Sequence, residues 1–429
     1  MKKAIVVGSG AGGCAAARVL AGSFEVAVLE AGDAFEPFAY RLSTFEPARK
    51  AGLFLDERMI SLLFPAMRIQ KAQEGLVHVT GRCVGGTTAL ATGNALRYDR
   101  FLADVGLDLD GEFRDLAAVV PQTREHHRRW SDLTVRLFEA FEQLGFDPQV
   151  TPKFMEDANR CIACGHCVLG CPHGAKWTAD RLLDGVPNVT VRTGCSVLRV
   201  ATECGRATGV WLREAGKPKR FEAADLVVVA AGGLGTPVVL NASGIPTQPT
   251  LFVDPVICVA APWPGARLDA QLPMPFVAQR DEYILSPYFD WLSFFFNGAW
   301  RRPAHDIMSI MVKFADSSLG SYDGRRLDKP LTGHDRAIVE RSVEESKQVL
   351  QAMGVPRSDM FLGTVNAGHP GGCLPLTPAE AESLHNPTLP ENLYVADSSL
   401  FPRSMGNPPI LTIMALATRV ARMAAGRFA

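Results

Sequence analysis

The sequence predicts an α/β fold that combines a parallel sheet, assembled from distant parts of the chain, with a second α+β region. Two observations predict the parallel sheet. A β-branched strand within residues 1–7 leads into a glycine turn at 8–13, an Ala-rich helix and a second strand that ends in Glu30. Much later, the fully apolar run 226–230 again precedes glycines, with a helix expected to start near Pro237. Fully apolar runs of this length are typical of strands buried on both faces.

The glycine turn GSGAGG at residues 8–13 has the spacing and the setting of a dinucleotide-binding βαβ unit. Gly8 permits the tight turn, Gly10 lets the backbone approach a pyrophosphate, and Gly13 lets the helix pack closely on the strand. The helix N-terminus then faces the phosphate charge. Glu30, about 20 residues beyond the turn, is placed to accept hydrogen bonds from ribose hydroxyls. Together these features predict a bound dinucleotide.

Length and composition predict an ordinary globular protein of two domains. The chain has 429 residues, of which 21% are charged, and a formal net charge of −1. This balance argues against nucleic acid or an acidic membrane surface as a partner. No apolar run reaches the roughly 18 to 20 residues that cross a bilayer, so no membrane span is expected. Because a strand begins directly after the first residues, no signal peptide is expected and a cytoplasmic location is predicted.

The rest of the chain predicts further elements around a second glycine turn at residues 81–90. A turn of small residues lets the backbone pass close to a flat ligand. Residues 34–74 carry no clear period and predict a loop that crosses the nucleotide. The expected helices are 131–144, 335–353 and 410–425, and the expected strands include 189–192, 195–201 and 208–213.

Residues 288–300 are unusually rich in aromatic side chains, with seven Phe, Tyr or Trp residues in thirteen positions. Large rings of this kind contribute much of the buried area in cores and pockets. Two interpretations stay open for this stretch. Either the rings line an apolar substrate pocket, or they pack a sheet against a helix.

Several motifs, taken in chain order, resemble those of the glucose-methanol-choline (GMC) flavoprotein oxidoreductases. The resemblance spans nearly the whole chain and is weakest at 100–155 and 250–360. Besides the turn at 8–13 with Glu30, the motifs are RCVGGTTA (82–89), AAGGLGTP (230–237) with SGI (243–245), HPGGC (369–373), and NLYVADSSLFP (392–402) running into LTIMALA (411–417).

The resemblance implies a two-domain arrangement in which each domain is discontinuous. A Rossmann-like FAD-binding domain is expected from residues 1–100, 186–250 and 375–429. An α+β substrate-binding domain is expected from residues 101–185, which include a cysteine run at 161–171, and from 251–374.

The resemblance also implies that the cofactor is FAD and that the substrate is an alcohol, oxidised at the carbon that carries the hydroxyl. Asp397 is expected near the ribityl or pyrophosphate part of the flavin. The helix after Pro408 would direct its N-terminal partial positive charge at the pyrimidine ring of the flavin, where negative charge gathers on reduction. The implied cofactor-binding residues are Gly8, Gly10, Ala11, Gly12, Gly13, Glu30, Ala31, Arg82, Val84, Gly85, Gly86, Thr87, Thr88, Val197, Ala231, Gly232, Asp397, Asn407 and Pro408.

By the same resemblance, His369 is the base that takes the proton of the substrate hydroxyl. A neutral imidazole with a pKa near the working pH suits this role. The second catalytic residue of the family, His or Asn, aligns with Pro408 in this chain, and Asn407 lies one position earlier. Either Asn407 substitutes for it through a local shift, or only one polar group acts.

A run of four cysteines, Cys161, Cys164, Cys167 and Cys171, has the C-x₂-C-x₂-C-x₃-C-P spacing of bacterial ferredoxins. Clustered cysteines in a reducing compartment favour metal over disulfides. The run therefore predicts an iron-sulfur cluster. Either all four thiolates bind one 4Fe-4S centre, or three bind it with a distant ligand, or the centre is 3Fe-4S. A tetrahedral zinc ion and unligated cysteines are the alternatives.

These patterns leave three functional hypotheses. The first is an FAD-dependent alcohol dehydrogenase that passes electrons through the cluster to an external acceptor such as ferredoxin, an electron-transfer flavoprotein or a quinone system. The second is a GMC-type oxidase or isomerase acting on a bulky, sterol-like alcohol without a working cluster. The third is a non-catalytic electron-transfer subunit that holds flavin and cluster.

Overall fold

The computed structural model describes residues 1–38, 42–51, 61 and 64–429. The loop expected over residues 34–74 lies in part outside this range. Its described part contains the short helix α2 (Glu46–Lys50) and the strand β3 (Met67–Lys71), besides 3₁₀ turns at Leu42–Phe45 and Gln73–Gly75. The expectation of a continuous loop was therefore wrong for β3, a five-residue strand at the sheet edge whose mixed side chains show no clear alternation.

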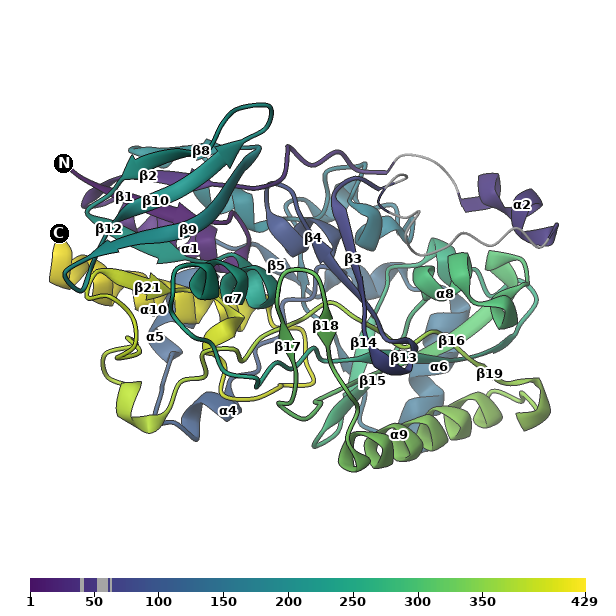
Figure 1. The fold of residues 1–429 in the computed structure, drawn as a ribbon. Helices are drawn as coiled ribbons and strands as arrows, with labels where there is room; N and C mark the ends of the chain where they lie inside the picture. The colour runs from purple at the N-terminus through teal and green to yellow at the C-terminus, as the bar shows by residue number, and fades with distance from the viewer. Residues whose placement is uncertain (39–41, 52–60, 62–63) are drawn as a thin grey trace.

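The first sheet is parallel and five-stranded, in the order β21-β12-β1-β2-β8, and both chain termini lie beside it (Figure 1). Val7 pairs with Leu29 and Val229, and Val229 pairs with Val395. Because these strands end in register, the residues that follow them meet at one edge of the sheet. The strands are β1 (Lys2–Val7), β2 (Phe24–Leu29), β8 (Val189–Arg192), β12 (Leu226–Val229) and β21 (Leu393–Val395).

A smaller antiparallel sheet, in the order β11-β10-β9, adjoins the parallel one. Its strands are β9 (Cys195–Glu203), β10 (Arg206–Glu214) and β11 (Arg220–Ala223). The strands predicted at 195–201 and 208–213 fall inside β9 and β10. Two short antiparallel pairs stand apart from the sheets, β5 (Gln122–Thr123) with β7 (Lys153–Phe154), and β17 (Ser321–Tyr322) with β18 (Leu327–Asp328).

The large second sheet has nine strands and a mixed arrangement, in the order β3-β4-β20-β13-β16-β15-β14-β6 with β19 also paired to β13. Its central strand β16 is buried along its whole length. The other bounds are β4 (Val77–Gly81), β6 (Gln149–Val150), β13 (Val256–Pro262), β14 (Phe276–Gln279), β15 (Tyr283–Pro287), β16 (Ile307–Phe314), β19 (Phe361–Leu362) and β20 (Asn366–Ala367).

Helices cover both sheets, and the predicted long helices are confirmed to within a few residues. Two have the side-chain caps that their sequences favour: Ser131 accepts from the Thr134 N–H at 3.3 Å, and Thr332 forms a reciprocal capping box with Asp335. Helices α1 and α10 pack together beside the parallel sheet, while α9 packs on the large one. The bounds are α1 (Ala11–Leu20), α4 (Arg100–Ala103), α5 (Asp110–Ala117), α6 (Asp132–Gln143), α7 (Gly232–Ala242), α8 (Trp291–Phe296), α9 (Gly333–Ala352) and α10 (Ile410–Phe428).

Two large hydrophobic clusters correspond to the two main sheets. Each strand of the parallel sheet comes from one of the three segments expected to form the FAD-binding domain. β3 and β4 belong to the large sheet, and α5 packs on α10, where Arg419 and Arg422 pair with Glu112. None of the described helices is long and apolar enough to cross a membrane.

Candidate functional site

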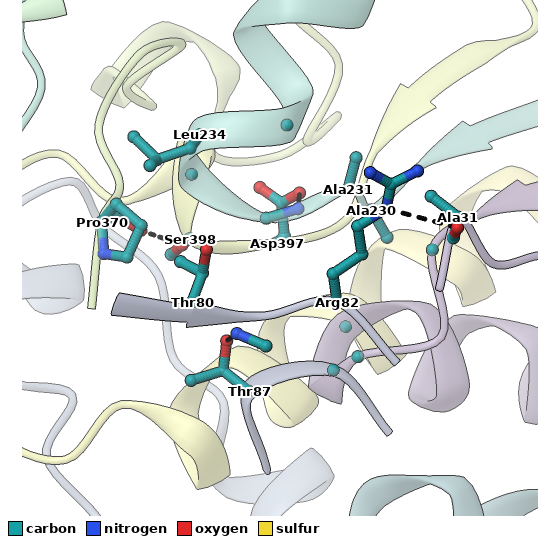
Figure 2. Close-up of a pocket in the computed structure, with 18 of the residues that line it drawn as sticks. Ala31, Thr80, Arg82, Thr87, Ala230, Ala231, Leu234, Pro370, Asp397 and Ser398 are labelled. Atoms are coloured by element: carbon teal, nitrogen blue, oxygen red, sulfur yellow. Dashed lines mark hydrogen bonds between the residues drawn. The ribbon is translucent and has the colours of Figure 1, made fainter. Parts of the chain in front are cut away.

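A cavity of about 660 Å³ lies where the strands of the parallel sheet end (Figure 2). Gly8, Glu30 and Ala230, directly after β1, β2 and β12, border it, and so does Asp397, two residues after β21. Fourteen of the predicted cofactor-binding residues line this cavity: Gly8, Gly10, Ala11, Gly12, Glu30, Ala31, Arg82, Gly86, Thr87, Thr88, Val197, Ala231, Gly232 and Asp397.

The two glycine turns approach each other closely at this cavity because Gly10 and Gly86 have no side chains. Gly8 has a positive φ of 99°, and a methyl group on Gly12 would collide with the carbonyl oxygen of Ala396. A methyl group on Gly86 would lie 2.9 Å from the Cα of Gly10. Gly10 itself has open space where a side chain would stand. The close backbone approach and the open Gly10 fit a pyrophosphate-containing cofactor such as FAD.

Glu30 fixes the first glycine turn to the end of β2. Its Oε2 accepts hydrogen bonds from the Ser9 N–H at 2.9 Å and the Ser9 hydroxyl at 2.7 Å, and its Oε1 accepts from the Gly32 N–H at 2.8 Å. A carboxylate has about four acceptor positions. Glu30 therefore keeps acceptor capacity on the cavity side, where ribose hydroxyls were expected.

Asp397 organises the start of helix α7. Its Oδ2 accepts from the Gly232 N–H at 2.8 Å and the Thr236 hydroxyl at 2.6 Å, and its Oδ1 accepts from the Ser399 N–H at 2.8 Å. Burial raises the pKa of the Asp397 carboxyl. The helix begins at Gly232 and not near Pro237. Asp397 accepts a hydrogen bond from the first N–H of the helix, and the glycines of the first turn have no side chains that would need space.

Other predicted cofactor residues lie outside this cavity. Gly13 packs on the carbonyl of Gly8, as close helix-strand packing requires. Val84 and Gly85 belong to the second glycine turn but do not border the cavity. The side chain of Asn407 donates a hydrogen bond to the Met405 carbonyl at 3.2 Å and borders neither this cavity nor the next one described below, whereas Pro408 borders the latter.

Sequence reasoning missed the wall of the cavity that the large sheet provides. Arg68 and Gln70 from β3 and Thr80 from β4 line it, together with Tyr322 from β17. The one available signal was the spacing of Arg68 and Gln70, which puts both side chains on one face of a strand. Burial and the nearby Arg82 lower the pKa of Arg68.

A second cavity of about 160 Å³ joins the first through a shared wall, and His369 stands in that wall. Pro408 and the first turn of α10 lie at the same place. Its lining is mostly apolar and includes three of the seven aromatic residues predicted as pocket or core, Tyr288, Trp291 and Phe295. Other members of that stretch, Phe289, Phe294 and Trp300, pack in the core of the large sheet, so both interpretations hold in part.

His369 is held as a neutral imidazole. Its Nδ1 is buried without a hydrogen-bond partner among the described residues. Burial lowers the pKa of His369 well below its ordinary value, and the positive charge of Lys313 and the neighbouring His78 act in the same direction. A neutral ring that borders both cavities can accept a proton from a ligand in the smaller one.

The cysteine run packs against the second glycine turn, because the Lys176 ammonium donates to the Ala89 carbonyl of that turn and to a carbonyl of the run. All ten cysteines are free thiols, and the four of the run are partly exposed. Cys171 Sγ accepts from the Ala175 N–H at 3.3 Å, and Lys176 donates to the Cys167 carbonyl at 2.7 Å. In the described part of the chain, no three His, Cys, Asp or Glu side chains are grouped so that they could hold a metal ion. The residues as placed therefore do not fit the predicted iron-sulfur cluster or a zinc ion.

Comparisons with known proteins agree with this architecture. A family model described as GMC oxidoreductase matches residues 2–269. A GMC-type oxidoreductase of Mycobacterium tuberculosis is 33% identical over 269 residues, which are 58% of this chain and 40% of that protein. The long-chain-alcohol oxidase FAO1 of Arabidopsis thaliana is 24% identical over 515 aligned positions, covering 96% of this chain and 65% of that one.

Protein MJ1450 of Methanocaldococcus jannaschii is 24% identical over 347 residues, covering 79% of this chain and 85% of that one. Among solved structures, pyridoxine 4-oxidase from Mesorbium loti superposes with a TM-score of 0.73 at 19% identity, covering 98% of this chain and 99% of that one. That likeness shows the mixed α/β fold. Since the family model matches more than half of the residues, the chain belongs to the GMC oxidoreductase family.

Proposed function

We propose that this protein is an FAD-dependent oxidoreductase that oxidises the CH–OH group of an alcohol with an apolar body. The observation that carries the proposal is the place of His369, in the wall between a dinucleotide-sized cavity and a small apolar one. FAD, when bound in the larger cavity, would supply a hydride acceptor for the substrate carbon. The glycine turns and Glu30 would hold the cofactor.

The substrate hydroxyl would lie beside His369, which takes its proton as the C–H bond breaks and the carbonyl forms. The neutral state of the imidazole makes it competent for this step at neutral pH. The small cavity is lined by rings and aliphatic side chains such as Trp291, Phe295 and Met311. Its apolar lining favours a hydrocarbon chain or ring over a sugar.

The test is anaerobic reduction of the FAD-loaded protein by a panel of alcohols. We expect hexanol or another apolar alcohol to bleach the visible flavin absorbance, and glucose to leave it unchanged. Sodium dithionite serves as the control, since it reduces a bound flavin without using the substrate site. If dithionite bleaches the flavin and no alcohol does so, the proposed reaction is wrong.

A substitution at Gly10 distinguishes an effect on cofactor binding from an effect on folding. We expect Gly10→Ala to lower the affinity for FAD about ten- to hundredfold, because one overpacked contact costs about 1–3 kcal/mol. Because the added methyl group at Gly10 would stand in open space, we expect no loss of stability in the FAD-free protein. Fluorescence titration with FAD and urea unfolding of the FAD-free protein measure the two quantities.

Two further glycine variants control this prediction. Gly111→Ala, in helix α5 with open space around it, should change neither the affinity nor the fold. Gly12→Ala should destabilise the FAD-free protein, because its methyl group would meet the Ala396 carbonyl. Unchanged FAD affinity in Gly10→Ala would place the cofactor elsewhere.

The electron acceptor distinguishes an oxidase from a dehydrogenase. Peroxide formed under air during alcohol oxidation would identify an oxidase. Without peroxide, a dehydrogenase that delivers electrons to ferredoxin, an electron-transfer flavoprotein or a quinone system is the remaining version. Re-oxidation of the alcohol-reduced protein by each acceptor measures the preference.

An iron-sulfur dehydrogenase is the second candidate function, and the ferredoxin-like cysteine spacing alone favours it. Iron and acid-labile sulfide analysis of protein purified without air tests it directly. About four irons per chain would support the cluster. Flavin bands without iron would leave only the alcohol-oxidising flavoprotein.

A further inference from the structure

A buried lysine borders the small cavity beside His369. Lys313, on the central strand β16, has a side chain only 2% exposed, and it lines that cavity. Among the described residues of this lining, no other Lys, Arg, Asp or Glu is present. Pro408 lies in the same wall but has no hydrogen-bond donor. An ammonium group in a mostly apolar cavity is unfavourable unless a partner charge or polar group stabilises it.

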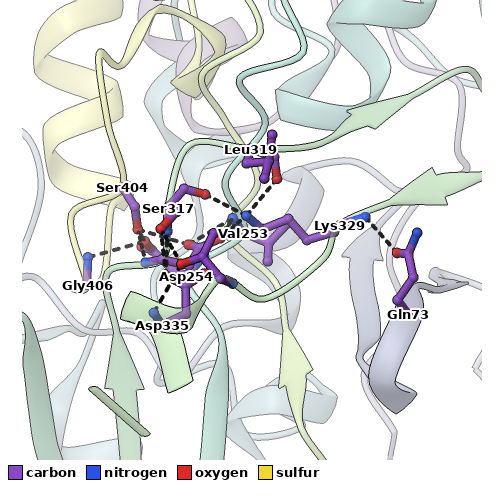
Figure 3. Close-up of polar contacts among 11 residues, drawn as sticks. Gln73, Val253, Asp254, Ser317, Leu319, Lys329, Asp335, Ser404 and Gly406 are labelled. Carbon is purple, nitrogen blue, oxygen red and sulfur yellow. Dashed lines mark hydrogen bonds and ion pairs between the residues drawn. The ribbon is translucent and has the colours of Figure 1, made fainter. Parts of the chain in front are cut away.

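Asp254 holds this lysine in place. The Lys313 Nζ lies 2.6 Å from Asp254 Oδ2, and both side chains are buried. Asp254 Oδ1 accepts from the Ser404 hydroxyl and from the Gly406 N–H, both in the loop before α10 (Figure 3). Burial lowers the pKa of Lys313, and the Asp254 carboxylate opposes this shift. The ion pair therefore stabilises the charged form of the ammonium and fixes its direction.

The ammonium group of Lys313 has donors to spare. It carries three N–H groups, and its hydrogen bond to Asp254 uses one of them. In the described structure no second acceptor contacts it. Lys313 and His369 line the same small cavity, and the positive charge of Lys313 is one of the causes that lower the pKa of His369. One proton acceptor and one cationic donor thus border the same small volume.

We propose that Lys313 is a second catalytic residue, whose ammonium donates a hydrogen bond to the oxygen of the substrate hydroxyl. The inference rests on the proposed alcohol oxidation. As His369 takes the hydroxyl proton, negative charge gathers on the oxygen, and Lys313 stabilises it. The hydride leaves the carbon for the cofactor, the C=O bond forms, and Lys313 keeps its own protons throughout. Asp254 acts as its positioning residue.

Kinetics of the FAD-loaded protein test this role. We expect Lys313→Met to lower the rate of flavin reduction at saturating hexanol about 10²- to 10³-fold, as the loss of one preorganised donor does in other enzymes. Rates are taken per bound flavin, so partial misfolding does not count. Lys217→Met is the control, because Lys217 is exposed, pairs with Glu214 and borders neither cavity. Its rate per flavin should stay near that of the unmodified protein.

Ligand binding gives a readout that a structural role would not move. Hexanoate presents an anionic oxygen to Lys313, and hexanamide presents a neutral one of the same size. We expect Lys313→Met to weaken hexanoate about ten- to hundredfold and hexanamide far less, while Lys313→Arg keeps the preference for the anion. Perturbation of the flavin spectrum reports both affinities.

Each remaining outcome decides the question. An equal effect of Lys313→Met on both ligands, or an unchanged reduction rate, overturns the role of Lys313. If no Lys313 variant folds, the unmodified protein serves: binding of hexanamide without hexanoate would exclude an available ammonium. If no alcohol reduces the flavin but hexanoate binds through Lys313, the proposed reaction fails while the oxygen-binding site stands.

Discussion

His369→Ala is expected to lower the rate of alcohol-driven flavin reduction about 10²- to 10⁴-fold, the usual contribution of a general base. His369 borders both cavities and has an unpartnered buried Nδ1, so its removal deletes the proton acceptor without breaking a hydrogen-bond network. FAD should remain bound, because the glycine turns and Glu30 belong to the larger cavity. Stopped-flow mixing of the FAD-loaded variant with hexanol under nitrogen measures the rate.

The pH dependence provides a second check on the same residue. An ordinary histidine loses its basic form as the pH falls through about 6.5. Burial holds the pKa of His369 well below that value, so the neutral ring persists to lower pH. The reduction rate should therefore stay flat from about pH 8 to about pH 6 and fall only in more acidic solution.

An exposed histidine gives the control for both measurements. His305, whose side chain is 57% exposed, lies near Asp306 and borders neither cavity. His305→Ala should reduce flavin at the unmodified rate. A full rate in His369→Ala would show that another base takes the proton, and a rate that halves near pH 6.5 would contradict the buried neutral imidazole. A non-catalytic electron-transfer subunit would show no alcohol-driven reduction in either protein.

The cofactor cavity was largely predictable from sequence because its chemistry is local. The turn at 8–13 and Gly86 need small residues at fixed spacings, and the strands before them are short and apolar. Once β1, β2, β12 and β21 pair in parallel, their ends must converge. Because Val7 is in register with Leu29 and Val229, the segments that follow these strands lie at a single edge of the sheet.

The small cavity was not predictable in this way, because its wall comes from positions between 64 and 410. Lys313 is the one charged residue in a mostly apolar strand, and its partner Asp254 lies 59 positions away. No local period reports such a pair. For the cysteine run the reason is the opposite one, since its spacing describes a loop but not the directions in which the thiols point, and the described residues form no metal-holding group.

Removal of the buried cation Lys329 is expected to destabilise the fold by about 3–5 kcal/mol. Lys329 and Asp316 form an ion pair at 2.8 Å, and neither side chain is exposed. Lys329 also donates to the carbonyls of Ser317 at 2.6 Å and Leu319 at 2.9 Å (Figure 3). Lys329→Met would leave the Asp316 carboxylate buried without this cation. The free energy of unfolding in urea measures the loss.

An exposed ion pair sets the scale for that measurement. Arg206 and Glu391 lie 2.6 Å apart with side chains 49% and 43% exposed, so Arg206→Met should cost less than about 1 kcal/mol. A loss in Lys329→Met as small as that in Arg206→Met would show that the buried pair contributes little.

The uncompensated charge, and not lost packing, should cause most of the Lys329→Met deficit. Asp316 accepts from the backbone N–H groups of Val253 and Asp254, so Asn at this position keeps an acceptor while removing the charge. Lys329→Met combined with Asp316→Asn should therefore recover more than half of the lost stability.

Lowering the pH should also recover the stability lost in Lys329→Met, because protonation removes the charge of Asp316. Burial already raises the pKa of Asp316, and loss of Lys329 raises it further. A carboxyl whose pKa is higher in the folded than in the unfolded protein stabilises the fold when protonated, and this contribution is lost as the pH rises through the folded-state pKa. The deficit of Lys329→Met should therefore shrink as the pH is lowered from neutral, and a deficit that grows in acid would assign the loss to packing.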